Sequence, residues 1–379
     1  MTLNLIQNRQ PSTSTPTTVF KFVALPDLHI GHYRVNMNSF FNNIQTYVYP
    51  QLEDIDILFI PGDWFHTLFT LSSPAGYRGV EFMRDLSRLS LRYNFKIRMV
   101  TGTFLHDRDQ HQFWNLFTHD NNIAVFDSIH IEELLGLRIL YIPDHSPKNS
   151  MDIIKRLMKD RGIDKLDMVI GHGYFEHNLP KAAKVHDCVF KASDFEHLVK
   201  GFVVFGHDHQ HAVYKNIISG GSFDRHRHGE EEPKGFPVLY YNKETGQKRC
   251  EFIENKNSTI FKTIDSTHLD NVKDVVDFFN QTVYPIAKER EPVIIYIRVL
   301  SDDPDVNEAL RELVRKRFPN VILTFKRKTV KEVKKLRDTS VQHLTIINQT
   351  NLSDLIYKEI KGDLSKKDIE SVLEEISSS

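Results

Sequence analysis

The feature that most constrains the fold of this chain is a set of short apolar runs, each ending next to an aspartate or a histidine. Residues 57–60 form one such run and are predicted to be a buried parallel strand. Pro61 and Gly62 end this strand, because neither residue suits a strand interior. Asp63 therefore lies at the carboxyl end of the strand, where open α/β sheets bind their ligands, and His66 follows closely.

Four further predicted strands end in the same way. In an extended segment, residues two positions apart point to one face, so an Asp-x-His or His-x-His pair can approach one ion together. Each strand end alone has an ordinary explanation as a turn, but five of them at one sheet edge predict a metal site. The side chains concerned are Asp27 and His29 after residues 19–25, His106 after residues 96–100, His172 after residues 167–170, and His207 and His209 after residues 202–205.

Helices are predicted between these strands. The sequence favours helices over residues 38–49, 76–92 and 151–159, and a further strand over residues 138–142. The alternation of apolar strands with helices predicts the α/β class.

Composition excludes several other kinds of protein. The 379 residues carry a net charge of −1, so any binding to nucleic acid must be local rather than a property of the whole surface. Cys188 and Cys250 are the only cysteines, which rules out a disulfide framework and favours a reducing cytoplasm. The sequence has no apolar run of membrane-spanning length and no signal-peptide pattern at its N-terminus, so we expect a cytoplasmic protein.

The residue types at the strand ends favour particular metals and a particular substrate. Carboxylates and imidazoles without cysteine favour Mn, Fe or Zn over Ca or a thiolate site. The ligands are too many for one ion, and Asp63 can bridge two ions with its two oxygens. Two such ions activate a water and support in-line displacement at phosphorus, so a phosphoester is the expected substrate. His66 and His106, if they are not ligands, can protonate the leaving oxygen or stabilise the developing charge.

The order of these motifs carries a resemblance. The motifs are Asp27-x-His29, Gly62-Asp63, His106-Asp107, Gly171-His172 and Gly206-His207-Asp208-His209. Together they resemble those of the calcineurin-like metallophosphoesterases over residues 19–250. His66, three residues after Asp63, and the segment 220–236 are similar to their counterparts in the SbcD-type nucleases of DNA double-strand-break repair.

This resemblance implies a β-sandwich flanked by helices and a nuclease that uses two Mn²⁺ ions. It implies exonuclease and endonuclease activity in DNA repair, recombination or replication. The expected partners are DNA, a coiled-coil ATPase of the SbcC type and a second copy of the chain. The apparent lack of a long disordered tail favours a bacterial or phage protein.

The resemblance also implies a role for each site residue. One metal is held by Asp27, His29 and His209, and the other by His172 and His207. Asp63 bridges the two metals, while His66 and His106 are catalytic residues that bind neither metal.

One position departs from the family pattern. The family has a Gly-Asn-His-Asp motif whose Asn binds the second metal, whereas this chain has two extra residues and no Asn. Alignment on Gly102 puts Thr103 in that place, and alignment on His106 puts Leu105 there. Because leucine cannot bind a metal and threonine is a weak neutral donor, we expect the second ion to bind more loosely than the first.

The rest of the chain is expected to serve DNA and the partner. Residues 1–18 read as a flexible arm before a nuclease domain at 19–254. Residues 259–329 are predicted to be a small α/β unit, and the resemblance implies that it caps DNA. Residues 330–379 are expected to be a basic linker and an ATPase-binding tail. The α/β unit should contain strands over 259–263, 292–300 and 321–326 and helices over 272–280 and 305–318.

The tail is predicted to contain two helices. Ser353 caps one, and Ser365 caps the next. The apolar stripe of the second helix comprises Ile369, Val372, Leu373 and Ile376. This stripe fits either the chain's own body or the ATPase, and the resemblance favours the ATPase. Lysine and arginine are frequent over residues 326–337, which fits either a solvated surface or a contact with DNA phosphates.

Two other functions remain open at this stage. The same scaffold can serve a phosphatase or a small-molecule phosphodiesterase, although a small substrate needs neither the α/β unit nor the apolar tail. The missing Asn also allows a regulatory subunit with a degenerate metal site. Cleavage of linear duplex DNA in Mn²⁺ would separate these possibilities.

Overall fold

The computed structural model describes residues 18–326 except Phe69, Leu71, Asp120, His145, residues 179–188, Thr267, Asp270 and residues 290–292. All of the described residues belong to one compact unit that ends at Lys326. Nearly all of the predicted N-terminal arm, the basic segment beyond Lys326 and the predicted tail helices lie outside the described residues.

One six-stranded sheet contains the strands that lead to Asp27, Asp63 and His106. Its order is β14-β13-β1-β2-β3-β4. Strands β1 to β4 run parallel, and β13 pairs antiparallel with both β1 and β14. Every residue of β2 is buried, which explains why this run is continuously apolar. The bounds are β1 Val19–Ala24, β2 Ile57–Pro61, β3 Lys96–Val100, β4 Ile123–Phe126, β13 Gly235–Asn242 and β14 Lys248–Glu254.

A second six-stranded sheet contains the strands that carry the later histidines. Its order is β11-β12-β10-β7-β6-β5. The four central strands run parallel, and the two edge strands, β5 and β11, are antiparallel to their neighbours. The bounds are β5 His130–Leu134, β6 Leu137–Ile142, β7 Met168–His172, β10 Val203–Gly206, β11 Ala212–Tyr214 and β12 Ile217–Ser219.

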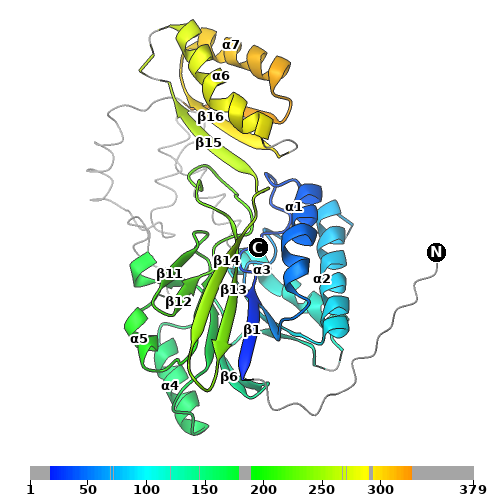
Figure 1. The fold of residues 1–379 in the computed structure, drawn as a ribbon, viewed down its shortest axis with the longest axis vertical. Coiled ribbons are helices and arrows are strands. Elements are labelled where there is room, and N and C mark those ends of the chain that lie inside the picture. Colours follow the sequence, from blue (N-terminus) through cyan, green and yellow to red (C-terminus); the bar gives the residue numbers. More distant parts are fainter. Residues whose placement is uncertain are drawn as a thin grey trace, which may run out of the picture. The chain divides into compact units, whose positions relative to one another are not determined.

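The two sheets pack face to face and are covered by helices on their outer sides (Figure 1). Between the sheets, Phe22 and Phe59 of the first sheet belong to one core with Ile170 and Val204 of the second. Because side chains alternate along a strand, the next residues face the helices. These helices are α1 Met37–Asn43 and α2 Pro74–Tyr93 on the first sheet, and α4 Ser150–Asp160 and α5 Ala192–Glu196 on the second. The predicted α/β sandwich flanked by helices is therefore confirmed.

Most of the predicted elements occur, with two corrections. The helix predicted over 38–49 is α-helical only to Asn43, and Ile44–Val48 forms a π-turn in which the N–H of Tyr49 donates to the carbonyl of Ile44. The helix predicted over 272–280 extends to Glu289, because its apolar face continues through Val283 and Ala287.

Several elements were not predicted. Strands β4, β5, β11 and β14 lie at sheet edges and are partly exposed, which weakens their apolar pattern, and the buried strands β12 and β13 were also missed. The remaining short elements are α3 Phe104–Asp107, β8 Tyr174–Phe175, β9 Val189–Phe190, and the helical turns Tyr49–Gln51, Arg108–Phe117 and Glu176–Asn178.

Residues 260–326 form a three-stranded parallel sheet with its own core. The strand order is β15-β16-β17, and Phe279, Ile297 and Leu310 are among the residues of that core. Asp303 caps α7 by accepting hydrogen bonds from the backbone N–H groups of Asp305 and Val306. The bounds are β15 Ile260–Asp265, α6 Val272–Glu289, β16 Ile295–Leu300, α7 Pro304–Arg317 and β17 Val321–Lys326. None of the described helices combines the length and apolarity needed to cross a membrane.

Candidate metal centre

The loops that follow the strands adopt unusual backbone conformations. Asp27, His29, Asp63 and His207 have positive φ angles of 50°, 46°, 51° and 96°. Residues other than glycine rarely adopt positive φ angles, and backbone strain of this kind concentrates at functional sites. The fold thus holds four of the predicted ligands in conformations that the chain would not adopt by local preference.

Hydrogen bonds join the loops after β1 and β2. The backbone N–H of Asp27 donates to the carbonyl of Gly62 at 3.2 Å, and that of His29 donates to the carbonyl of Asp63 at 3.0 Å. In return, the N–H of His66 donates to the carbonyl of Ile30 at 3.0 Å. These hydrogen bonds hold the two loops together and keep His29 beside Asp63.

Asp107, which has no role in the sequence prediction, anchors the loop after β2. It is buried at the end of α3, and its two carboxylate oxygens accept four backbone N–H groups. The four donors and their distances are Asp63 at 3.0 Å, Trp64 at 2.9 Å, Phe65 at 3.3 Å and Gly102 at 2.8 Å. Its position beside His106 in a recognised motif was the available signal for this role.

Glycines allow the loops of the two sheets to approach each other. A Cβ on Gly206 would lie 2.1 Å from the carbonyl oxygen of Pro61, and one on Gly62 would lie 2.3 Å from His172 Nδ1. His172 Nδ1 also hydrogen-bonds the Pro61 carbonyl at 2.7 Å. This close approach brings the histidines of the second sheet to the carboxylates of the first.

Two pairs of histidines lie on either side of Asp63. His29 Nε2 is 3.0 Å from His209 Nε2, and His172 Nε2 is 3.0 Å from His207 Nδ1. Asp63 Oδ2 is 3.6 Å from His29 Nε2, while Asp63 Oδ1 is 3.5 Å from His172 Nε2. Asp63 thus directs one oxygen towards each pair.

These distances fit the coordination of metal ions. Two nitrogens that each bind an ion at about 2.1 Å, at right angles to one another, lie about 3.0 Å apart. The ligand atoms of Asp63, His172 and His207 all lie within 4.8 Å of one another, and so do those of Asp27, His29 and Asp63. The six predicted ligands are therefore gathered around two positions at which a divalent cation fits.

Burial and mutual contact shift the pKa values of Asp63, His172 and Asp27. Burial opposes ionisation of Asp63, but the neighbouring His172 and the N–H of Thr103 hold the pKa of that carboxyl below its usual range. Burial likewise opposes protonation of His172, yet Asp63 and Asp27 raise its pKa well above the usual value. Burial raises the pKa of Asp27 to about 7.

Thr103, not Leu105, lies beside the pair formed by His172 and His207. Its Oγ1 is 3.4 Å from both His172 Nε2 and His207 Nδ1, and 3.3 Å from Asp63 Oδ2. Leu105 is 64% exposed. Of the two alignments left open by the sequence, the one on Gly102 therefore describes the spatial arrangement.

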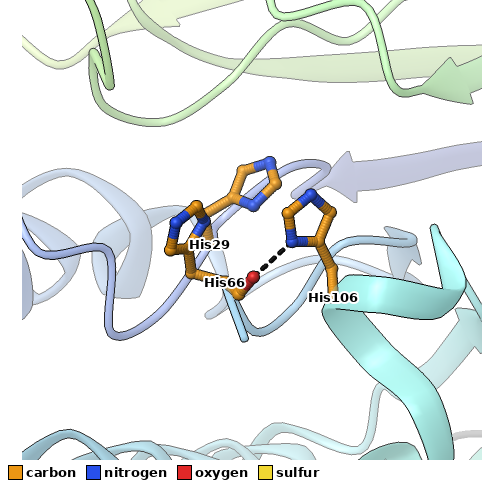
Figure 2. Close-up of side chains that lie close together, drawn as sticks. All are labelled: His29, His66 and His106. Atoms are coloured by element: carbon orange, nitrogen blue, oxygen red, sulfur yellow. Dashed lines mark hydrogen bonds between the residues drawn. The ribbon is translucent and has the colours of Figure 1, made fainter. Parts of the chain in front are cut away.

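His66 and His106 lie on the His29 side of the site. His106 Nδ1 hydrogen-bonds the backbone carbonyl of His66, as Figure 2 shows. The ring of His106 lies 4.6 Å from that of His29, and the ring of His66 lies 5.6 Å from it, between centroids. The three residues also form a group that could hold an ion, so their separation into ligand and catalytic groups stays a prediction.

Two further residues at this site were not predicted. Glu230 Oε1 accepts a hydrogen bond from His209 Nδ1 at 3.0 Å, and His226 lies beside the rings of His29 and His209. Burial opposes ionisation of Glu230, but His209 and Lys234 lower its pKa to about 2. Both residues come from the segment 220–236, which was recognised as a motif without any role for its individual side chains.

Comparisons with known proteins are weak. Neither a family model nor a curated protein matches the chain. One similar solved structure is that of a novel archaeal phosphodiesterase, with 12% sequence identity and a TM-score of 0.31 over 62% of this chain and 99% of that one. A second solved structure has 12% identity and a TM-score of 0.34 over the same shares. Likenesses at this level carry no functional argument, so the geometry of the site must supply it.

Proposed function

We propose that the chain is a phosphodiesterase that uses two divalent metal ions. The observation that carries the proposal is the position of Asp63 between two histidine pairs, with one carboxylate oxygen directed to each. Bound there, two ions would activate a water and stabilise the charge that develops around phosphorus. The carboxylate and imidazole ligands fit Mn²⁺, which we propose as the natural metal.

The chain's own residues would orient the substrate and move protons. Because His106 Nδ1 donates a hydrogen bond to the His66 carbonyl, the ring is fixed, and in its imidazolium form it could give the Nε2 proton to the leaving oxygen. Burial and the nearby His106 lower the pKa of His66 to about 4, so the His66 ring is neutral near pH 7. A neutral ring can accept or donate a hydrogen bond to the phosphodiester without adding charge.

We propose DNA as the substrate. The support is the resemblance of the segment 220–236, and of the spacing between Asp63 and His66, to the SbcD-type nucleases. The α/β unit at 260–326 follows the phosphodiesterase sandwich, as a capping domain would. On this proposal the protein is a cytoplasmic exonuclease and endonuclease of DNA repair, recombination or replication.

The proposal includes two protein partners. One is a second copy of the chain, and the other is a coiled-coil ATPase of the SbcC type that binds the tail beyond Lys326. Both rest on the same resemblance. Co-purification of the full-length chain with its ATPase, with and without residues 353–379, would test the second.

Substrate assays in Mn²⁺ separate this function from its rivals. The full chain should cleave linear duplex DNA, and Asp63→Ala should not. Hydrolysis of bis(p-nitrophenyl) phosphate without DNA cleavage would favour a small-molecule phosphodiesterase. Hydrolysis of p-nitrophenyl phosphate alone would favour a phosphatase. Metal binding without hydrolysis of any of the three would favour a regulatory subunit.

A further inference from the structure

His226 is a buried histidine whose two ring nitrogens have no hydrogen-bond partner in the described part of the chain. Only 4% of its surface is exposed. Buried polar side-chain atoms are nearly always hydrogen-bonded, so such a ring requires an explanation. No role in the proposed phosphodiesterase chemistry uses this residue.

The ring lies against the first histidine pair. Its centroid is 4.8 Å from that of His29 and 5.1 Å from that of His209. Ligand nitrogens of these three histidines all lie within 4.8 Å of one another. Two nitrogens on opposite sides of one ion, each at about 2.1 Å, lie about 4.2 Å apart, so only a small movement would bring the third ring to an ion.

One carboxylate holds both His226 and His209 in place. Glu230 Oε2 accepts the backbone N–H of His226 at 3.0 Å, and Glu230 Oε1 accepts His209 Nδ1 at 3.0 Å. The bond to Nδ1 leaves Nε2 of His209 for an ion, which is the usual arrangement of a metal-binding histidine. The loop before His226 is also fixed, because the Arg225 guanidinium donates to Ser258 Oγ at 2.6 Å.

We propose that His226 is a third imidazole ligand of the ion held by His29 and His209. This inference rests on the proposed metal site but adds a ligand to it and a preference among metals. A third nitrogen makes the site richer in imidazole, the ligand that Zn, Co and Fe favour more than Mn or Mg. His226 should therefore raise the affinity for Co²⁺ and Zn²⁺ more than that for Mn²⁺.

Metal binding by the metal-free full chain tests this proposal without reference to activity. The chelator-treated protein is titrated with Co²⁺, followed by visible absorption and calorimetry, and separately with Mn²⁺. His226→Phe keeps the ring and removes both nitrogens. We expect at least about tenfold weaker Co²⁺ binding at the first site, an altered absorption spectrum and a smaller effect on Mn²⁺.

His32→Phe is the matched control. His32 is buried, and its ring centroid lies 4.7 Å from that of His226, but it belongs to none of the histidine groups that could hold an ion. Its substitution should leave the Co²⁺ spectrum and affinity unchanged. Equal Co²⁺ binding by His226→Phe and the unsubstituted chain would overturn the proposal and make His226 a packing residue.

X-ray absorption on the unsubstituted chain with one equivalent of Co²⁺ covers the case in which His226→Phe fails to fold. Two imidazoles on the ion overturn the proposal, and three support it when the count is unchanged in a chain that carries His66→Phe and His106→Phe. The result for the His226 site can be distinguished from the result for the proposed phosphodiesterase activity. A chain that binds Co²⁺ through three imidazoles but hydrolyses no phosphodiester would contradict the function and retain the His226 site.

Discussion

At the scale of single residues, Asp63 has the most demanding position in the site. It is 2% exposed, it has a positive φ of 51°, and its two oxygens face different histidine pairs. A substitution at Asp63 should therefore affect both ions at once.

We expect Asp63→Ala to reduce phosphodiester hydrolysis more than about 100-fold. Changing even a residue that only hydrogen-bonds a metal ligand typically lowers metal affinity or activity by about 10–100-fold. Calorimetry should show weaker binding of both Mn²⁺ equivalents. The control is Asp208→Ala, since Asp208 is a neighbouring, partly exposed carboxylate outside the predicted ligand set. Near-normal hydrolysis by Asp63→Ala in saturating Mn²⁺ would refute the bridging role.

His66 and His106 allow catalysis to be separated from metal binding. His66→Ala and His106→Ala should each retain two Mn²⁺ equivalents and lose about 10²–10⁴-fold in rate, the usual contribution of a general acid or base. Rates and calorimetry on the same samples check this. If either variant loses an ion, that histidine is a ligand, as the grouping of both with His29 also allows.

At the scale of elements, the short helix α3 fixes the loop after β2. Asp107 at its end accepts the backbone N–H groups of Asp63, Trp64, Phe65 and Gly102. The carboxylate thus links the ends of β2 and β3, which lie side by side in the first sheet. The position of Asp63 depends on this element rather than on the local sequence around Asp63.

Asp107→Asn should destabilise the protein by about 1–3 kcal/mol, because one oxygen becomes an NH₂ group and leaves buried N–H donors unpaired. Urea unfolding of the metal-free protein measures this loss, and weaker Mn²⁺ binding should accompany it. Asp109→Asn, two residues along and exposed, is the matched control and should have little effect. Equal unfolding curves for the two variants would show that the Asp107 contacts contribute nothing.

At the scale of the whole molecule, histidines make stability depend on pH. Burial and nearby positive groups lower the pKa of His32 to about 3 and those of His66 and His228 to about 4. In the unfolded chain a histidine has a pKa of about 6.5. The unfolded state therefore binds more protons than the folded state between these values.

The contribution of these histidines to the free energy of unfolding of the metal-free protein should therefore be complete above about pH 6.5. It should be lost as the pH falls towards about 4. Thermal unfolding in chelator across pH 4–8 measures this dependence. His32→Phe should make the decline shallower, because the substituted side chain cannot take up the proton. A decline of unchanged steepness would mean that His32 does not contribute.

Much of the site was predictable because it depends on local order in the chain. An apolar run followed by Asp63, or by the His207-x-His209 pair, identifies a strand and the ligands at its end, and the strand ends meet at one edge of the sheets. Alternation of strands and helices likewise predicted the α/β class. Some of the strands that were missed, such as β11 and β14, are partly exposed and carry a weaker apolar pattern.

Only the tertiary structure decided which side chains meet. His29 and His209 are 180 residues apart, and their contact depends on the packing of one sheet on the other. The same packing selected Thr103 over Leu105, gave Asp107 its role as an anchor and placed His226 beside the first histidine pair. Spacing in a sequence determines the face on which a side chain lies within its own segment. Distances between segments follow from strand order and the close approach of the sheets at Gly62 and Gly206, which local spacing does not encode.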